Sequence, residues 1–239
     1  MEKGILYGVG VGPGDPELVT RKAERILREA DVIAVPDKGA GEKTALRIVE
    51  DLAAGKELLS CPTPMIRDRE RLDRCYEEIA GRICALLEAG QIVAFITLGD
   101  PTVYSTYIYV HKKVLARGYD AQIIPGVPSF CAAAARLGVS LCEGAERLLI
   151  VPASHQAAGC LDVKANKVFM KAGRAIGELR DLLAERGLLD RASLVANCGM
   201  EGEAVYPRFA DVEDGTGYFS VVLVKEPEEP APGREKQEG

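Results

Sequence analysis

The sequence predicts an α/β protein of two lobes with mostly parallel sheets. Strand-like and helix-like segments alternate along the 239 residues, which is typical of parallel sheets covered by helices. The run QIVAFITL at 91–98 is apolar throughout, as expected of a parallel strand buried on both faces. Glycine or proline follows several of these runs, at the sheet edge where open α/β proteins bind ligands.

Each element is predicted from its apolar period, its length and its flanking residues. The predicted strands are 5–12, 32–36, 91–98, 121–125, 147–153, 167–171, 192–196 and 218–225. The predicted helices are 15–30, 42–54, 69–89, 101–117, 128–137 and 176–187. A boundary near 117–120 separates an N-terminal lobe at 1–118 from a C-terminal lobe at 119–225. The acidic, proline-rich segment 226–239 has almost nothing to bury and is predicted to be disordered.

Composition narrows the function. The net charge is −6, aromatic residues are 5%, and Trp is absent, which disfavours a broad nucleic-acid interface. No apolar run approaches the ~20 residues of a membrane helix, and the start of the chain lacks signal-peptide features, so we expect a cytoplasmic protein. The seven cysteines form no CxxC pair. We interpret them as free thiols of a reducing compartment, with a metal or redox site as the alternative.

The first candidate loop, GVGVGPGDP at 8–16, follows the first strand. Its glycines allow close backbone approach, and a helix N-terminus favours anions. It fits neither the dinucleotide fingerprint nor the Walker A pattern, because the third glycine and a following GK[ST] are missing. Asp15 also fits a simple helix N-cap, because Pro16 follows it at the first helical position.

Two further loops follow predicted strands. The segment LGDPTVYS at 98–105 joins a fully apolar strand to an aromatic and hydroxyl-bearing turn. Capping by Asp100 does not explain Gly99 at that junction, where backbone groups can hold a small polar ligand. The segment PGVPSFCAAAA at 125–135 carries Ser129 at a helix start. Its alanines fit tight helix packing or close approach of a flat ligand.

No nucleophile-and-base arrangement is visible. The chain has two histidines, His111 and His155, and no GxSxG elbow. The residues therefore indicate a ligand-binding α/β enzyme that works mainly by positioning.

Taken in order, these loops resemble the tetrapyrrole (corrin/porphyrin) methylase family, and most closely its branch acting at C20 of precorrin-2 or cobalt-factor II. The resemblance covers about 4–225. It rests on YGVGVGPGDPELVTRKA, LGDPTVYSTYIYV, IIPGVPSFCAAAARLGVSLCEG, LLIVPA, VFMKAGR and SLVANCGMEGEAVY. It implies two α/β lobes, a homodimer, and S-adenosylmethionine held folded in the cleft between the lobes, with no protein-bound metal.

The resemblance also implies site residues. The cofactor contacts carried over by motif are Leu98, Gly99, Asp100, Val103, Pro128, Ser129, Met170, Asn197, Cys198 and Ser220. Cys198 and Ser220 depart from the small residue or alanine of other members. The glycine-rich loop would face the tetrapyrrole through Pro13 and Asp15. Asp15 is the candidate base for the C20 proton, with the N-cap as its alternative role.

A tetrapyrrole with eight carboxylates needs local basic residues on an acidic protein. Arginines cluster at 67, 69, 71 and 74, and Lys171 and Arg174 follow the strand that ends at Met170. Arg67, Arg71, Lys171 and Arg174 are the substrate-binding candidates. A solvated helix face is the alternative for the first cluster.

Other functions remain open. One is a sister methylase that acts at another ring carbon, and another is an rRNA 2′-O-methyltransferase of the same fold, which the acidic composition disfavours. A non-catalytic tetrapyrrole- or nucleotide-binding module would not need the full set of pocket loops.

Overall fold

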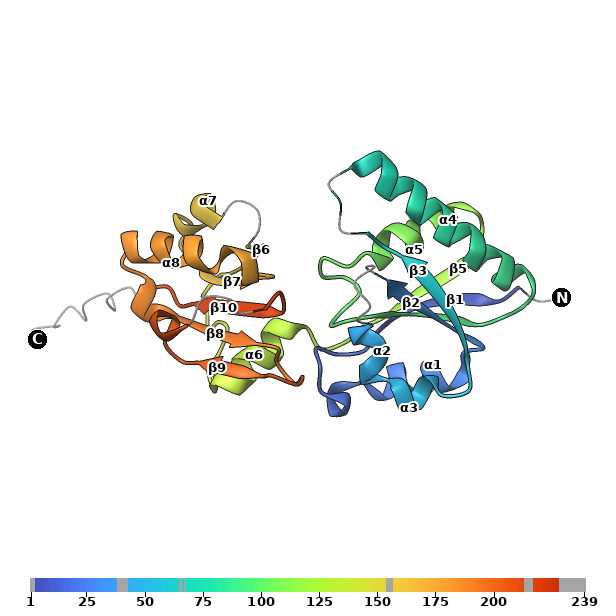
Figure 1. The fold of residues 1–239 in the computed structure, drawn as a ribbon, viewed down its shortest axis with the longest axis horizontal. Helices are drawn as coiled ribbons and strands as arrows, with labels where there is room; N and C mark the ends of the chain where they lie inside the picture. The colour runs from blue at the N-terminus through green and yellow to red at the C-terminus, as the bar shows by residue number, and fades with distance from the viewer. Residues whose placement is uncertain are drawn as a thin grey trace, which may run out of the picture. The chain divides into compact units, whose positions relative to one another are not determined.

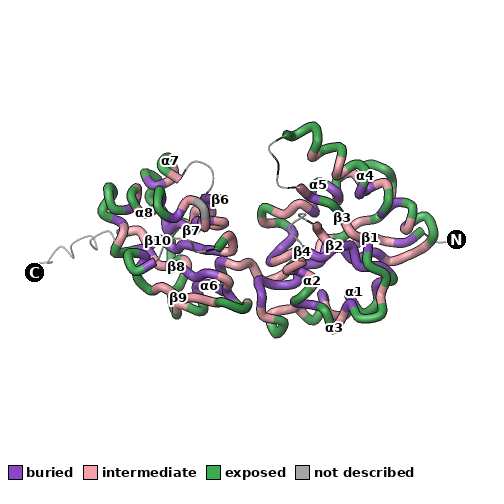
Figure 2. The backbone as a smooth tube through the Cα atoms, viewed as in Figure 1, coloured by how far each residue is buried: buried purple, intermediate pink, exposed green. Residues whose placement is uncertain are grey.

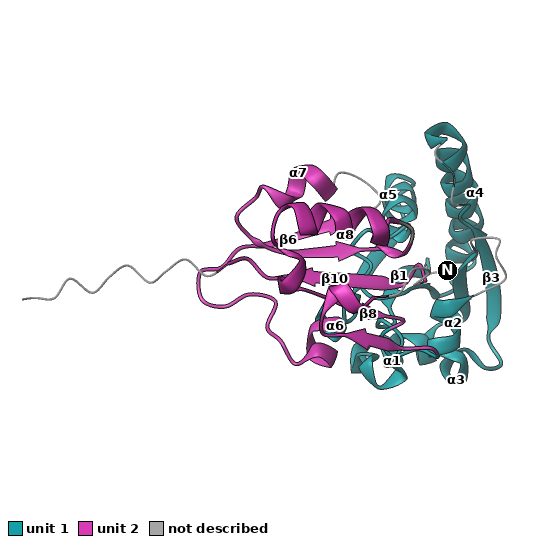
Figure 3. Ribbon diagram, turned by 60° about the vertical axis from the view of Figure 1, so that its left-hand side comes forward, with its two compact units in different colours: residues 1–132, 198–201 teal, residues 133–197, 202–239 magenta. Residues whose placement is uncertain are grey.

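In the computed structural model the chain divides by its contacts into two compact units (Figures 1 and 3). The structure describes residues 3–37, 43–64, 66, 68–153, 157–212 and 217–227. Unit 1 comprises Met1–Ala132 and Cys198–Glu201, and unit 2 comprises Ala133–Asn197 and Gly202–Gly239. No helix within the described residues has the length and apolar content that a bilayer crossing requires.

Unit 1 contains a five-stranded sheet in the order β3-β2-β4-β1-β5, and every neighbouring pair is parallel. Its strands are β1 (Ile5–Gly10), β2 (Val32–Asp37), β3 (Glu57–Pro62), β4 (Val93–Thr97) and β5 (Asp120–Ile124). All five residues of β4 are buried, because this strand has a neighbour on each side and helices on both faces. The apolar run at 91–98 is therefore confirmed as a covered parallel strand.

Two hydrophobic clusters lie on the two faces of this sheet, and Figure 2 shows the buried stretches of the chain in purple. The helices are α1 (Arg21–Glu29), α2 (Thr44–Ile48), α3 (Glu50–Ala53), α4 (Arg69–Glu88) and α5 (Tyr107–Ala116). One cluster contains buried residues of α1, α2 and α3, such as Ile26 and Ile48. The other contains buried residues of α4 and α5, such as Ile83 and Val110. The helices predicted from the sequence thus pack on both sides of the sheet.

Several predicted helix boundaries were wrong. The first helix begins after Thr20, whose side chain accepts the Ala23 amide, and Asp15 instead caps a separate 3₁₀ turn at Pro16–Leu18. The predicted 42–54 helix is interrupted between Ile48 and Glu50, and the 101–117 helix begins only at Tyr107. In each case an irregular turn occupies residues that the apolar period had assigned to helix.

Unit 2 contains a mixed sheet in the order β6-β7-β10-β8-β9. Its strands are β6 (Leu148–Pro152), β7 (Asn166–Met170), β8 (Ala192–Ala196), β9 (Ala204–Tyr206) and β10 (Ser220–Val224). Among the described strands of this sheet, β6 and β7 alone pair in parallel. The α/β class is confirmed, and the parallel arrangement holds for the first sheet. The second sheet differs because the short β8–β9 connection reverses the chain, which a parallel pair does not allow.

The helices α7 (Ala157–Leu161) and α8 (Ile176–Glu185) contribute to the core of unit 2 with Phe169, Val222 and Leu194 from the sheet. The 3₁₀ turns of this unit are Gly173–Ala175, Leu189–Arg191 and Phe209–Asp211. Helix α6 (Ser129–Leu137) contains the contact boundary, since Ala132 belongs to unit 1 and Ala133 to unit 2.

The predicted lobes at 1–118 and 119–225 stay a prediction. By contacts unit 1 continues to Ala132, because β5 pairs with β1 in the first sheet. The prediction of a disordered tail falls largely on residues 228–239, which lie outside the described residues.

Candidate active site

In unit 1 the three candidate loops follow three adjacent strands, β4, β1 and β5. The chain continues from β1 to α1 on one face of the sheet and from β4 to α5 on the other. Neighbouring parallel strands whose connections leave to opposite faces form a switch point, where open α/β sheets bind ligands beyond the carboxyl ends of the strands. Residues 11–16, 98–105 and 125–128 all follow their strands at that edge.

The backbones of these loops are in direct contact at four glycines. The Gly99 amide donates to Gly12 O at 2.7 Å. A Cβ on Gly10 would lie 2.6 Å from both Gly126 N and Gly99 O, and a Cβ on Gly126 would lie 2.2 Å from Gly99 O. Any larger residue at Gly10 or Gly126 would force the loops apart. These glycines serve loop packing at a site edge, and no dinucleotide fingerprint is needed to explain them.

Asp100 joins two of the loops through its carboxylate. Oδ1 accepts hydrogen bonds from the Thr102 amide at 2.7 Å and from Thr102 Oγ1 at 2.5 Å. Oδ2 accepts the Gly126 amide at 2.9 Å. The residue is only 8% exposed. Local capping, which the sequence offered as an alternative, accounts for Oδ1 alone, whereas Oδ2 bridges to the loop after β5.

Gly99, unlike Gly10 and Gly126, has space for a Cβ. It has φ of +74°, and the atoms nearest to a Cβ built on it are Ser129 N and Val127 O at 3.9 Å and Pro128 Cα at 4.0 Å. The Ser129 amide lies in the first turn of α6, where amides have no intrahelical partner. A side chain at Gly99 would therefore start in ordinary van der Waals contact with an amide and a carbonyl, in contrast to the clashes at Gly10 and Gly126.

Leu98 and Val103 flank this site and are half-buried. The Val103 amide donates to Asp100 O at 3.2 Å. The structure therefore brings together six predicted cofactor residues of unit 1: Leu98, Gly99, Asp100, Val103, Pro128 and Ser129. Cys198 also belongs to unit 1, where it is buried and its carbonyl faces Gly14.

The glycine-rich loop ends in a capped turn. Asp15 Oδ1 accepts the Glu17 amide at 2.9 Å, so the capping role suggested by the sequence is confirmed. Within the described part of the chain Oδ2 accepts no hydrogen bond. Pro13, a predicted substrate contact, is buried, whereas Asp15 is partly exposed.

In unit 2 three predicted cofactor residues share one edge of the sheet. Met170 ends β7, Ser220 begins β10, and Asn197 directly follows β8. The register pairs Val221 with Met170 and Ser220 with Ala196, which places the three residues on neighbouring strands. Ser220 is fully buried and its hydroxyl donates to Gly217 O at 2.6 Å.

The predicted basic contacts are only partly described. Arg71 lies in the exposed first turn of α4, near Arg69 and Arg74, which are also exposed. Arg67 lies outside the described residues, and so does the side chain of Arg174. Lys171 is half-buried and has φ of +58°.

A positive φ at non-glycine residues is a feature of the site that was not predicted from the sequence. Among the described non-glycine residues, Tyr104, Lys171 and Asn197 adopt this conformation. It costs of order 1–3 kcal/mol per residue and clusters at functional sites. Each lies in or next to a predicted site segment. Tyr104, half-exposed beside Val103, was not among the predicted residues.

The contacts of His111 indicate a structural role. Its Nδ1 lies 2.9 Å from the hydroxyl of the buried Tyr107, which donates to Gln122 O at 3.1 Å. Burial raises the pKa of Tyr107 and lowers the pKa of His111. The Tyr107 ring occupies the space where a side chain at Gly8 would lie. These residues support β1 below the glycine-rich loop.

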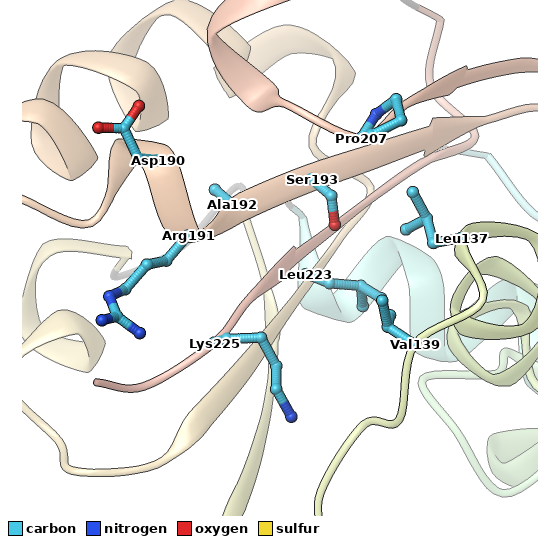
Figure 4. Close-up of a pocket in the computed structure, with 9 residues that line it drawn as sticks. All are labelled: Leu137, Val139, Asp190, Arg191, Ala192, Ser193, Pro207, Leu223 and Lys225. Carbon is cyan, nitrogen blue, oxygen red and sulfur yellow. The ribbon is translucent and has the colours of Figure 1, made fainter. Parts of the chain in front are cut away.

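A cavity of about 260 Å³ lies elsewhere in unit 2 (Figure 4). It is lined by Leu137, Val139, Asp190, Arg191, Ala192, Ser193, Pro207, Leu223 and Lys225. Most of the lining residues come from the residues at the start of β8 and at the end of β10, opposite to the edge that carries Met170 and Ser220, and the others come from around the end of α6 and from the residue after β9. Among the predicted site residues that the structure describes, none lines it.

The model of the Tetrapyrrole (Corrin/Porphyrin) Methylases matches residues 5–212, which is most of the chain. The chain belongs to this methylase family. A Methanocaldococcus jannaschii protein named probable cobalt-precorrin-2 C(20)-methyltransferase is 35% identical over 226 residues, covering 92% of this chain and 95% of the relative. A Salmonella typhimurium protein named cobalt-precorrin-2 C(20)-methyltransferase is 33% identical over 228 residues, covering 92% and 96%.

Solved structures of the family share the fold. Uroporphyrin-III-C-methyltransferase from Thermus thermophilus is 27% identical with a TM-score of 0.69, covering 93% of this chain and 94% of that chain. The cobalt precorrin-4 methyltransferase CbiF has a TM-score of 0.74 at 20% identity, covering 92% and 94%. The resemblance read from the sequence motifs is confirmed.

Proposed function

We propose that this chain is an S-adenosylmethionine-dependent methyltransferase that methylates C20 of precorrin-2 or cobalt-factor II in cobalamin biosynthesis. The observation that carries the proposal is identity of 33–35%, over more than nine-tenths of the chain, to relatives named for that reaction. The loop cluster after β4, β1 and β5 supports it from the geometry. No comparison favours the alternatives of RNA methylation or non-catalytic binding.

The methyl donor would supply an electrophilic sulfonium methyl group, so the protein needs no nucleophile of its own. Gly99 and Val103 would contact the donor through backbone groups, and the Ser129 amide and Val127 carbonyl would orient its polar parts. Asp100 would act as the tie that keeps the loop of Gly99 against Gly126, since both of its oxygens are already engaged. Held in line with the acceptor carbon, the reactants gain the rate advantage of orientation.

Met170, Asn197, Cys198 and Ser220 are proposed as further contacts of the same cofactor. The edge of the unit 2 sheet carries three of them on adjacent strands. Variants in each unit test the two sets of contacts separately, by calorimetry with S-adenosylhomocysteine.

Asp15 is proposed as the base that removes the C20 proton. Its Oδ1 is engaged in the cap, and Oδ2 remains available to accept a proton. Asn is as good an N-cap as Asp, so Asp15→Asn should fold like the wild type. We expect turnover to fall by roughly 10²- to 10⁴-fold, the usual contribution of a general base. Full turnover of the folded variant would leave Asp15 with the capping role alone.

The tetrapyrrole carboxylates are proposed to bind near Arg67, Arg71, Lys171 and Arg174, with Pro13 in the loop that faces the ring. Arg71 is exposed and lies in the first turn of α4. We also propose a cytoplasmic homodimer, in line with the resemblance. Light scattering of the purified protein tests the dimer.

The proposed reaction is tested by incubating the protein with S-adenosylmethionine and either precorrin-2 or cobalt-factor II. Addition of one methyl group is the expected result. The two substrates distinguish a metal-free from a cobalt-containing acceptor.

A further inference from the structure

Gly14 lies in a contact that has no space for a side chain. It is buried in the glycine-rich loop. A Cβ on it would lie 2.5 Å from Cys198 O, 2.6 Å from Met200 Cγ and 2.9 Å from Gly199 C. The first and last of these are backbone atoms, which cannot rotate away as a flexible side chain can. The loop that carries Asp15 therefore rests directly on the backbone of the segment Cys198–Glu201, which belongs to the same unit.

Gly199 makes the contact reciprocal. Its φ is +72°, which favours glycine. A Cβ on it would lie 2.6 Å from Asp15 N and 3.0 Å from Asp15 Cβ. Gly14 is thus closed in by 198–200, and Gly199 is closed in by Asp15. We call this contact the Gly14–Gly199 interlock.

The interlock gives Asp15 a second set of contacts besides its cap. On the chain that follows, Asp15 Oδ1 accepts the Glu17 amide at 2.9 Å and Asp15 O accepts the Leu18 amide at 3.0 Å. On the other side, Gly199 lies against Asp15 N and Cβ. The backbone and Cβ of Asp15 are therefore held by the second segment, and its Oδ1 is held by the capped turn.

Other glycines of the chain show that turn formation does not require such a contact. Gly187 also has a positive φ, of +66°, yet a Cβ on it would meet nothing within 4 Å. Gly159 has neither a positive φ nor a neighbour within 4 Å of a Cβ. The packing at Gly14 and Gly199 therefore exceeds what their local backbone conformation demands.

We propose that Gly14 and Gly199 are positioning residues for methyl transfer, holding the Asp15 carboxylate in place through the interlock. This inference rests on the proposed function and on Asp15 as the base, and it adds a role for two residues that do not touch the reacting atoms. A side chain at either position would displace Asp15 from the acceptor carbon. A displacement of about 1 Å is enough to reduce a rate by about 10²-fold.

The test compares two variants with matched controls. Gly199→Ala is compared with Gly187→Ala, because both put alanine at a positive φ and only the first creates a clash. Gly14→Ala is compared with Gly159→Ala, because neither position has a positive φ. The measurements are kcat and KM for the tetrapyrrole, and the Kd for S-adenosylhomocysteine by calorimetry.

We expect kcat to fall by roughly 10- to 100-fold in Gly14→Ala and Gly199→Ala, with a much smaller change in KM. The control variants should keep the wild-type kcat. In an Asp15→Asn background, Gly199→Ala should cause no further loss, because both changes remove the same contribution. Equal kcat in variants and controls, or independent additive losses with Asp15→Asn, would overturn the inference.

A wild-type protein that methylates no tetrapyrrole would instead overturn the proposed function. If neither interlock variant folds, hydrogen exchange of the wild type decides. S-adenosylhomocysteine should then slow exchange at the Glu17 and Leu18 amides together with those of 198–201. Protection confined to 198–201 would contradict a mechanical link between the two segments.

Discussion

Asp100 Oδ2 accepts a hydrogen bond from the Gly126 amide at 2.9 Å, which ties the loop after β4 to the loop after β5. The two strands are not neighbours, because β1 lies between them in the sheet. The carboxylate therefore spans the carboxyl end of β1, where the glycine-rich loop begins. The Asp100 side chain thus joins two of the three loops, and the Gly99 amide joins the glycine-rich loop to them by donating to Gly12 O at 2.7 Å.

Asp100→Asn should weaken this arrangement. An amide group has one acceptor oxygen and one donor nitrogen, so it cannot accept from Thr102 and from Gly126 on separate atoms as the carboxylate does. Leaving one of these donors unpaired should lower the free energy of unfolding by about 1–3 kcal/mol. We also expect the Kd for S-adenosylhomocysteine to rise about tenfold, as a loss of about 1.4 kcal/mol would produce.

Urea unfolding and calorimetry measure the two effects of Asp100→Asn. Asp120→Asn is the control, because Asp120 is exposed at the start of β5. If both variants bind S-adenosylhomocysteine as tightly as the wild type, the tie is not needed for the cofactor site.

Arg71→Glu should weaken tetrapyrrole binding and leave cofactor binding unchanged. The Arg71 amide donates to the N-cap Asp68, so Arg71 occupies the N3 position of α4, where glutamate is favourable. The variant should therefore fold. Reversal of one charge near a polyanion should raise KM for the tetrapyrrole, and the increase should shrink as salt is added.

Arg21→Glu is the matched control for Arg71→Glu, since Arg21 is exposed in the first turn of α1. Steady-state kinetics at two ionic strengths distinguish the variants. Equal KM values in the two variants would show that the arginines of α4 form a solvated helix face and do not bind the tetrapyrrole.

The contact between α4 and α5 should depend on pH through Glu77. Hydrogen bonds from Lys113, at 2.9 Å, and from Arg117 hold the pKa of Glu77 below its ordinary value. A lowered pKa in the folded state stabilises the protein above the unfolded pKa of about 4.3, and this stabilisation is lost as the pH falls through the folded value. Glu77→Gln should therefore be less stable than the wild type at pH 7.

The difference between Glu77→Gln and the wild type should narrow as the pH falls below the unfolded pKa of about 4.3, and it should be smallest below the lowered pKa of the folded state, where the carboxyl is neutral in both states. Urea unfolding at several pH values measures it. Glu78→Gln provides the control from the adjacent exposed position. A stability gap that is independent of pH would show that the ion pairs contribute little.

Most strands and helices and the three candidate loops could be predicted from the sequence, for physical reasons. The apolar period identified β4, α4 and α8, because burial against a core sets that period. It missed β3, an edge strand with three exposed residues, and β9, which has only three residues. Such strands carry little apolar pattern because they bury only a small part of their surface.

The sequence indicated which loops form the candidate site, but it did not indicate most of the contacts between them. Glycine after an apolar strand identified Gly99, and the family motif identified Asp100 and Ser129. Nothing in the sequence indicates that Gly14 meets Cys198 and Gly199, which are more than 180 residues away along the chain. Such a contact arises only from the folded chain, since glycine is equally common in turns that touch nothing.

The most direct test of the account is the position of the transferred methyl group. The protein is incubated with precorrin-2 or cobalt-factor II and S-adenosylmethionine carrying a ¹³C-labelled methyl group, and the product is examined by mass spectrometry and NMR. The account predicts one labelled methyl group, bonded to C20. A label on another ring carbon, or an unmodified ring with both substrates, would contradict it.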